Sequence, residues 1–115
     1  MTLGQRQELF SRLIAKLILE MYARGFQVRC GDFWAKVRNP LEHKPNSLHY
    51  DKCAADLNLM KDGRLLVRTE DHRQFGDYWE SLHPHCRWGG RYNDGNHYEI
   101  LDRPLQTLNP SPTKE

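Results

Sequence analysis

Apolar and polar residues alternate from Ala54 to Leu59, and this alternation constrains the fold more than any other feature of the chain. Successive side chains of a β-strand point to opposite faces, so one face would carry Asp56 and Asn58 and the other only apolar side chains. The residues Lys-Asp-Gly at 61–63 are typical of a tight turn. We therefore predict a hairpin that returns through Leu65 to Val67, with a carboxylate on the polar face of its first strand.

The other periodic segments predict helices packed on a small sheet. Apolar residues recur at helical spacing between Phe10 and Met21, and Gly25 is placed to end that helix. A short strand at 26–29, a second helix with its apolar stripe at 75–82 and a last strand around 97–101 are expected, with the turn-rich HPHCRWGGRYNDGNH as a loop before that strand. The prediction is a single α+β domain over residues 1–103, a small antiparallel sheet with packed helices. Residues 104–115, which end in NPSPTKE, are expected to be disordered.

Charge and hydropathy exclude several classes of partner. The chain has 115 residues and a formal net charge of +2, too small to predict binding to a nucleic acid or to an anionic membrane. The apolar run from Leu13 to Met21 is interrupted by Lys16 and Glu20, which argues against both a membrane span and a signal-peptide core. The three cysteines are widely spaced and form no Cys-x-x-Cys pair. We therefore expect synthesis in the cytoplasm without a signal peptide, and no insertion into a membrane.

Six histidines in so short a chain suggest a metal site, and the predicted strand offers it a carboxylate. His49 precedes Asp56 by seven residues, so one nitrogen and one oxygen could reach the same ion. A catalytic zinc takes three protein ligands and keeps one position open, and His97 at the start of the last strand is the candidate for the third. Asp94 lies three residues before His97, where its carboxylate can act as a general base. A His and an Asp at this spacing also occur together by chance. The spacing alone is therefore equally compatible with a protein that binds no metal.

Two segments of the chain carry a more specific signal. Together, "SLHYDKCAADLNL" and "DGNH" resemble the motifs of the zinc D-alanyl-D-alanine carboxypeptidase family: Ser-x-His, six residues, Asp, then an acidic residue three positions before a second His. The stretches "GDFW", "DLNLMKDGRLL" and "TEDHRQFGDYWESLHPHCRWGGRYNDGNH" are similar to a phage-associated branch that includes L-alanyl-D-glutamate endopeptidase endolysins. The resemblance extends from Leu9 to about Ile100 and implies the hedgehog/DD-peptidase type of α+β fold.

The resemblance also implies a role for each matching residue. It makes His49, Asp56 and His97 the ligands of a Zn²⁺ ion, Asp94 the catalytic acid/base, and Ser47 a residue of the site.

The side chains that would contact the substrate are less well defined. Many relatives carry a Tyr-Arg-Thr type motif whose arginine contacts the substrate, but the aligned stretch here reads "GDFWAKVRNP", and Arg38 is the candidate in its place. Trp88 or Tyr92 is expected to line a peptide-binding cleft, and a tight turn beneath an aromatic lid is the alternative. Glu99 shares a strand face with His97, where it either orients that ring or faces solvent.

These expectations combine into a zinc-dependent peptidase that hydrolyses a peptide bond of the bacterial peptidoglycan stem peptide. It would be a monomeric phage or prophage endolysin that reaches the cell wall after holin-type release, and both the endopeptidase and the carboxypeptidase type stay open. One alternative is a non-catalytic, zinc-bearing cell-wall binding module, against which the acidic residue at Asp94 argues. A metal-dependent nuclease, suggested by "NDGNH", is another, and the small net charge and the strand position of Asp56 weigh against it.

Overall fold

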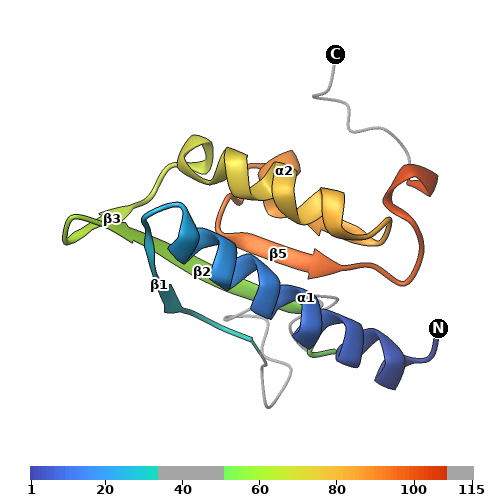
Figure 1. Cartoon of the computed structure of the whole chain (residues 1–115). Helices are drawn as coiled ribbons and strands as arrows, with labels where there is room; N and C mark the ends of the chain where they lie inside the picture. The colour runs from blue at the N-terminus through green and yellow to red at the C-terminus, as the bar shows by residue number, and fades with distance from the viewer. Residues whose placement is uncertain (34–50, 109–115) are drawn as a thin grey trace.

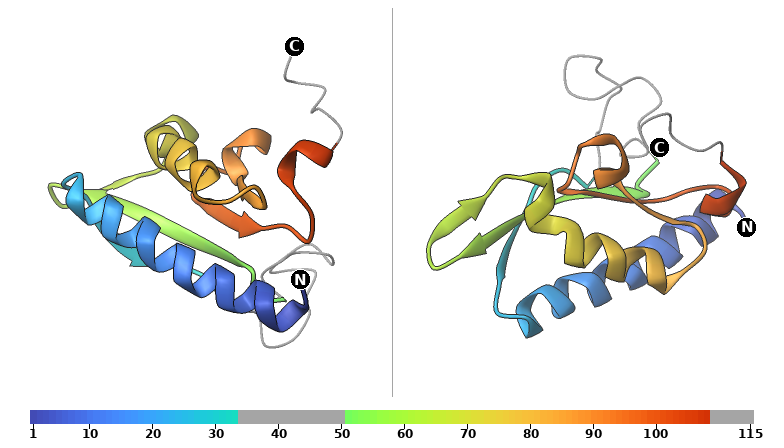
Figure 2. Two further views of the ribbon diagram at one scale, coloured as in Figure 1. Left: turned by 45° about the vertical axis from the view of Figure 1, so that its right-hand side comes forward. Right: turned by 90° about the horizontal axis from the view of Figure 1, so that it is seen from above.

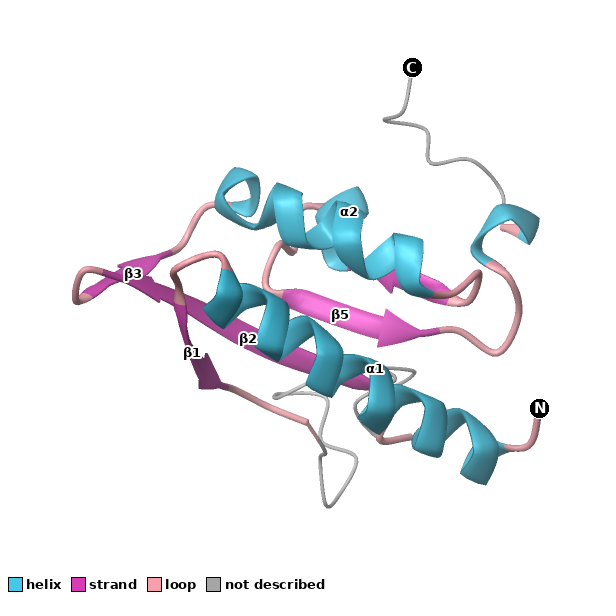
Figure 3. Cartoon of the chain, in the orientation of Figure 1, coloured by secondary structure: helices cyan, strands magenta, loops and turns pink. Residues whose placement is uncertain are grey.

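The computed structural model describes residues 1–33 and 51–108, and in these ranges it has two α-helices and an antiparallel sheet of five strands. In chain order, the elements are α1 (Leu3–Ala23), β1 (Gln27–Cys30), β2 (Ala54–Lys61), β3 (Arg64–Leu66), the 3-10 helix η1 (Thr69–His72), α2 (Arg73–Leu82), β4 (Cys86–Trp88), the 3-10 helix η2 (Gly89–Tyr92), β5 (His97–Ile100) and the 3-10 helix η3 (Leu105–Thr107). The predicted α+β class is confirmed (Figures 1 and 3). The narrower hedgehog/DD-peptidase type stays a prediction.

The eight residues of β2 form the centre of the sheet, whose strands run in the order β1-β2-β5-β4 with β3 also paired to β2. Every pairing is antiparallel, and the β2–β5 register places Asp56 directly opposite His97. The predicted hairpin joins β2 to β3, and its two turn residues, Asp62 and Gly63, have φ angles of 51° and 76°. Positive φ at both central residues is the conformation that such a two-residue turn requires.

The two faces of the sheet differ in chemistry because both helices lie on the same face (Figure 2). On that face, the apolar side chains of β2 and β5 pack against α1 and α2, as the alternation predicts. This core consists mainly of Phe10, Leu13, Ile14, Leu17, Met21, Ala55, Leu57, Leu59, Phe75, Trp79, Tyr98 and Ile100. The opposite face carries Asp56, Asn58, His97 and Glu99, so the candidate site lies on the face that α1 and α2 leave uncovered.

One prediction about the fold is wrong. The stretch before β5, expected to be a loop, contains strand β4, which pairs with β5 from Cys86↔Ile100 to Trp88↔Tyr98. A three-residue strand is too short for alternation to be visible in the sequence, and its pairing with β5 stabilises it. As a result, Arg87 joins the polar face of the sheet beside Glu99.

No helix in residues 1–33 and 51–108 is both long enough and apolar enough to cross a membrane. The predicted disorder of the tail concerns mainly residues that lie outside these ranges, and 105–107 form η3.

Candidate metal and catalytic site

Asp56 and His97 come together across the β2–β5 pairing. The Nδ1 atom of His97 lies 3.2 Å from Oδ1 of Asp56. The imidazole is buried, with 7% of His97 exposed, whereas the Asp56 side chain retains partial access to solvent. The strand register that buries the apolar face of β2 therefore also brings together two of the three predicted zinc ligands.

Glu99 holds the other nitrogen of the same ring. Its Oε1 lies 2.7 Å from Nε2 of His97, and its Oε2 accepts hydrogen bonds from Nε of Arg87 and from the hydroxyl of Tyr92. Only 4% of the Glu99 side chain is exposed, so the solvent-facing alternative for this residue is wrong. Two carboxylates thus fix the orientation of His97, one at each ring nitrogen. Arg87, which was not predicted for the site, neutralises the deeper of them.

Charges within this cluster favour ionised side chains despite burial. Burial acts to lower the pKa of His97, but the hydrogen bonds to Asp56 and Glu99 outweigh it and raise the pKa to about 9. For Glu99, burial acts to raise the pKa, and the hydrogen bond from His97 together with the positive charges of His97 and Arg87 brings it below its usual value. Burial, and then the charge of Glu99, raise the pKa of Tyr92, which therefore stays a neutral donor.

The arrangement fits a zinc site whose third ligand comes from elsewhere in the chain. Two donor atoms on one tetrahedral zinc, each at roughly 2.0–2.1 Å, lie roughly 3.3 Å apart, close to the separation of Asp56 Oδ1 and His97 Nδ1. Histidines that bind metals usually donate their other ring N–H to a carboxylate, as His97 does to Glu99. Within the described ranges, no group of three or more His, Cys, Asp or Glu side chains is placed to hold a metal ion. A metal ion held here would need a further ligand, and the residue predicted for that role, His49, lies outside those ranges.

Asp94 lies in the turn between η2 and β5 that leads into His97. Its N–H donates to the carbonyl of Gly89 at 2.9 Å, and its carbonyl accepts from the N–H of His97 at 3.1 Å. A Cβ atom on Gly89 would approach the Asp94 carbonyl oxygen to 2.3 Å and His97 Cβ to 2.7 Å, so the turn closes this tightly only over a glycine. The predicted base and the predicted ligand therefore belong to one tight, hydrogen-bonded turn.

The remaining predicted site residues fall into two groups. Ser47 and Arg38, like His49, lie outside the described ranges, and their roles stay predictions. Trp88 is 4% exposed, and its indole N–H donates to the carbonyl of Gly95 at 2.7 Å. This is the position of a core side chain that supports the Asp94 turn, and it offers little surface to a substrate. Tyr92, the other aromatic candidate, is 46% exposed and hydrogen-bonded to Glu99.

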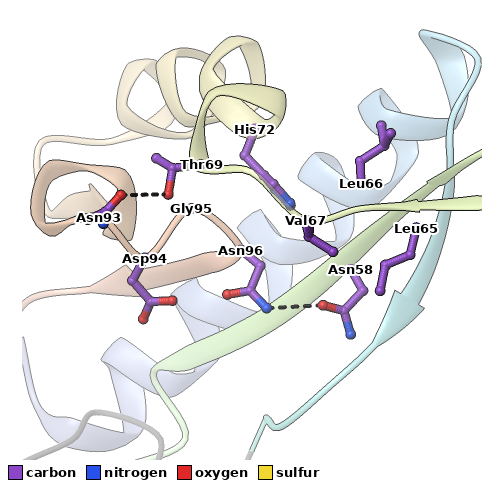
Figure 4. Close-up of a pocket in the computed structure, with 10 residues that line it drawn as sticks. All are labelled: Asn58, Leu65, Leu66, Val67, Thr69, His72, Asn93, Asp94, Gly95 and Asn96. Carbon is purple, nitrogen blue, oxygen red and sulfur yellow. Dashed lines mark hydrogen bonds between the residues drawn. The ribbon is translucent and has the colours of Figure 1, made fainter.

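Asp94 also lines a pocket of about 230 Å³ that the sequence did not predict (Figure 4). The side-chain amides of Asn58 and Asn96 form one wall, joined by a hydrogen bond of 3.0 Å. Leu66 and Val67 contribute apolar surface, and His72 lines the pocket from η1. The pocket therefore combines neutral polar groups and apolar groups beside a carboxylate.

His72 gives a prediction about stability. It is 2% exposed with Nδ1 2.8 Å from the Tyr98 hydroxyl, and burial lowers its pKa from 6.5 to about 4, although the charge of Asp71 acts in the opposite direction. Between these values the unfolded chain binds a proton that the folded chain does not, so the free energy of unfolding falls as the pH falls from 6.5 to 4. This residue should account for about 3 kcal/mol of that loss.

The comparison is between urea unfolding of the wild-type protein and of His72→Gln at pH 7 and pH 4, both with chelator so that metal release plays no part. The variant should lose about 3 kcal/mol less between the two pH values. An equal loss in both proteins would show that His72 is not the group responsible.

No family model matches this chain, and no curated protein matches it significantly.

Proposed function

We propose that this chain is a zinc-dependent peptidase that hydrolyses a peptide bond in the stem peptide of bacterial peptidoglycan. The observation that carries the proposal is the contact between Asp56 and His97 across β2 and β5, with Glu99 on the far nitrogen of the ring. In this proposal Asp56 and His97 are two of the zinc ligands, and the turn before His97 carries the acid/base Asp94. The proposal keeps His49 as the third ligand, with Ser47 and Arg38 at the substrate.

Each residue of the proposed site would have a distinct role in hydrolysis. A bound zinc supplies Lewis-acid chemistry, which lowers the pKa of water and polarises a carbonyl. Asp94 accepts the proton of the attacking water and returns it to the leaving amine. Glu99 and Arg87 act behind His97, where they fix its ring and exclude water from its buried side. We further propose that the protein is a monomeric endolysin that reaches the cell wall with the help of a holin.

Two substrates and a chelator separate the proposal from its rivals. Purified protein is incubated with peptidoglycan and with plasmid DNA, each with zinc and with chelator. We expect soluble wall fragments with newly formed amino termini, produced with zinc only, and intact plasmid throughout. Binding to peptidoglycan without release of fragments would favour the non-catalytic module, and cleaved plasmid the nuclease. Either result would overturn the peptidase.

A further prediction concerns Glu99. Replacing it with glutamine preserves its size but removes the charge that orients His97, so zinc affinity should fall by about 10- to 100-fold, the usual effect of removing such a partner. Competition with a chromophoric chelator measures the affinity. Glu80→Gln is the matched control. Glu80 is also paired with an arginine, Arg91, but it belongs to helix α2 and is not hydrogen-bonded to the ring of His97. Equal zinc affinity in the two variants would exclude a role for Glu99 at the metal.

A further inference from the structure

The pocket of about 230 Å³ lies at an interruption along one edge of β2. Residues 54–56 of this strand pair with β5, and residues 59–61 pair with β3 on the same edge, since β1 takes the opposite edge. Asn58 lines the pocket between the two paired segments, on the polar face of the sheet, and the buried ring of His72 lines it from η1. The pocket therefore extends from the open polar face of the sheet toward buried side chains.

Polar side chains at the rim of the pocket are paired with one another. The amide of Asn96 donates to the amide oxygen of Asn58 at 3.0 Å, and the hydroxyl of Thr69 donates to the amide oxygen of Asn93 at 3.2 Å. All four residues line the pocket. These two pairs join β2, η1 and the turn before β5 without the help of a ligand.

His72 brings a buried nitrogen without a partner to this pocket. The ring is 2% exposed, and its Nδ1 atom lies 2.8 Å from the hydroxyl of Tyr98. Its Nε2 atom has no hydrogen-bond partner among residues 1–33 and 51–108, although buried polar atoms are nearly always paired. Figure 4 shows the ring reaching from η1 toward the pocket that it lines. An atom of a ligand in the pocket could supply the missing partner.

The hydroxyl of Tyr98 determines whether that partner is a donor or an acceptor. Tyr98 is fully buried, and within the described part of the chain its hydroxyl is bonded to His72 alone. If Nδ1 carried the proton of the ring, it would donate to the hydroxyl oxygen and leave the hydroxyl hydrogen buried without an acceptor, which is costly. If the hydroxyl donates to Nδ1 instead, the neutral ring carries its proton on Nε2. Nε2 is therefore a donor, and its missing partner is an acceptor.

The ring stays neutral near neutral pH. Burial lowers the pKa of His72 to about 4, although the charge of Asp71 acts in the opposite direction. A neutral imidazole has a single N–H, so the hydrogen bond from Tyr98 to Nδ1 and the proton on Nε2 require each other.

We propose that this pocket binds a carbonyl group of a ligand, whose oxygen accepts a hydrogen bond from Nε2 of His72. A carbonyl oxygen suits this donor because it brings no hydrogen that needs a further partner. Leu66 and Val67, which also line the pocket, would contact the carbon substituents of the carbonyl. The inference is independent of the proposed function, because neither zinc nor hydrolysis enters it.

Two probes of nearly the same shape test this hydrogen bond. Cyclopentanone has an acceptor oxygen where methylenecyclopentane has a CH₂ group. Each is titrated at neutral pH into metal-free, isotope-labelled protein, while NMR follows the ring nitrogens of His72 and the backbone amides of Val67 and Thr69. The free protein should carry the ring proton of His72 on Nε2. The ketone should shift the signal of that proton as well as the two amides, and the hydrocarbon should leave the proton signal unchanged.

A pair of variants isolates the contribution of the donor. Tyr98→Phe retains the imidazole, whereas Tyr98→Phe combined with His72→Leu removes both members of a buried hydrogen bond, a change that is nearly neutral for stability. The ratio of ketone affinity to hydrocarbon affinity should be at least about fivefold lower in the double variant than in Tyr98→Phe, the effect of losing one hydrogen bond. The same two probes are compared in both proteins, so the difference in their hydration cancels.

Three results would each overturn the proposal. The first is an equal affinity ratio in the two variants. The second is a free protein whose His72 proton lies on Nδ1. The third is a wild-type protein in which neither probe shifts the pocket signals, which would mean that the pocket holds water only. The spectra of the wild-type protein decide the matter even if the double variant does not fold.

None of these outcomes bears on the peptidase. Metal-free protein binds the probes without hydrolysis, and release of wall fragments is measured separately with zinc. Binding of the ketone by a protein that releases no fragments would sustain the pocket and overturn the proposed function. Release of fragments by a protein that binds neither probe would do the reverse.

Discussion

Asp94→Asn is expected to lower the rate of peptidoglycan hydrolysis by about 100- to 10,000-fold, the range for losing a general acid/base, while zinc content and fold stay unchanged. The substitution preserves the shape of the side chain and removes its ability to take a proton. The backbone of Asp94, rather than its side chain, makes the hydrogen bonds to Gly89 and His97 that hold the turn. The variant should therefore fold and present His97 as the wild-type protein does.

Release of muropeptides and zinc content are measured on the same preparation. Asp102→Asn, an exposed aspartate beyond β5, serves as the control and should retain full activity. If zinc disappears together with activity, Asp94 is a ligand and not the base. A zinc-loaded Asp94→Asn protein with wild-type activity would rule out the acid/base role altogether.

His97→Ala is expected to abolish tight zinc binding, and hydrolysis with it. The substitution removes one of the proposed ligands and leaves Asp56 without the ring nitrogen that faces it. In the wild-type protein, zinc at 100 times its Kd should stabilise the folded state by about 2.7 kcal/mol, because the ion binds the folded state alone. Adding chelator should therefore lower the melting temperature of the wild-type protein and leave that of His97→Ala unchanged.

His85→Ala is the histidine control. His85 lies 2.9 Å from the Leu101 carbonyl through its Nδ1 atom, and this hydrogen bond does not involve Asp56 or His97, so zinc should still bind and the response to chelator should persist. His49→Ala should behave like His97→Ala if it supplies the third ligand. One tightly bound zinc per chain in His49→Ala or His97→Ala would contradict that residue's assignment as a ligand.

The sequence predicted correctly those features for which the local pattern of residues and the burial of apolar side chains favour the same backbone conformation. The alternation in β2 buries Ala55, Leu57 and Leu59 under the helices, and this requires Asp56 to face the other way. The Asp-Gly turn likewise specifies the hairpin by its own backbone preference. Both inferences needed only residues that are neighbours in the sequence. The prediction that Asp56 meets a histidine of the last strand needed one further assumption, that this strand lies beside β2 in the sheet.

Features that depend on contacts between distant segments could not be inferred in this way. Nothing near Arg87 in the sequence indicates a strand, and its link to Glu99 exists only because β4 pairs with β5. The burial of Trp88 depends on Gly76 and Gly90, where a Cβ atom would approach its ring to 2.1 Å and 2.2 Å. These close approaches convert an expected cleft residue into a core residue. The pocket at Asn58 arises likewise from the ends of two strands.

The central position of β2 has a consequence for insertions and deletions. This one strand pairs with β1, β3 and β5, and it places Asp56 opposite His97 and Asn58 in the wall of the pocket. Adding or deleting a single residue before Asp56 would exchange the faces of the strand, forcing a carboxylate among the core side chains and apolar groups into the site. Length variation in a lineage of this protein should therefore be confined to loops or occur in β2 by two residues at a time.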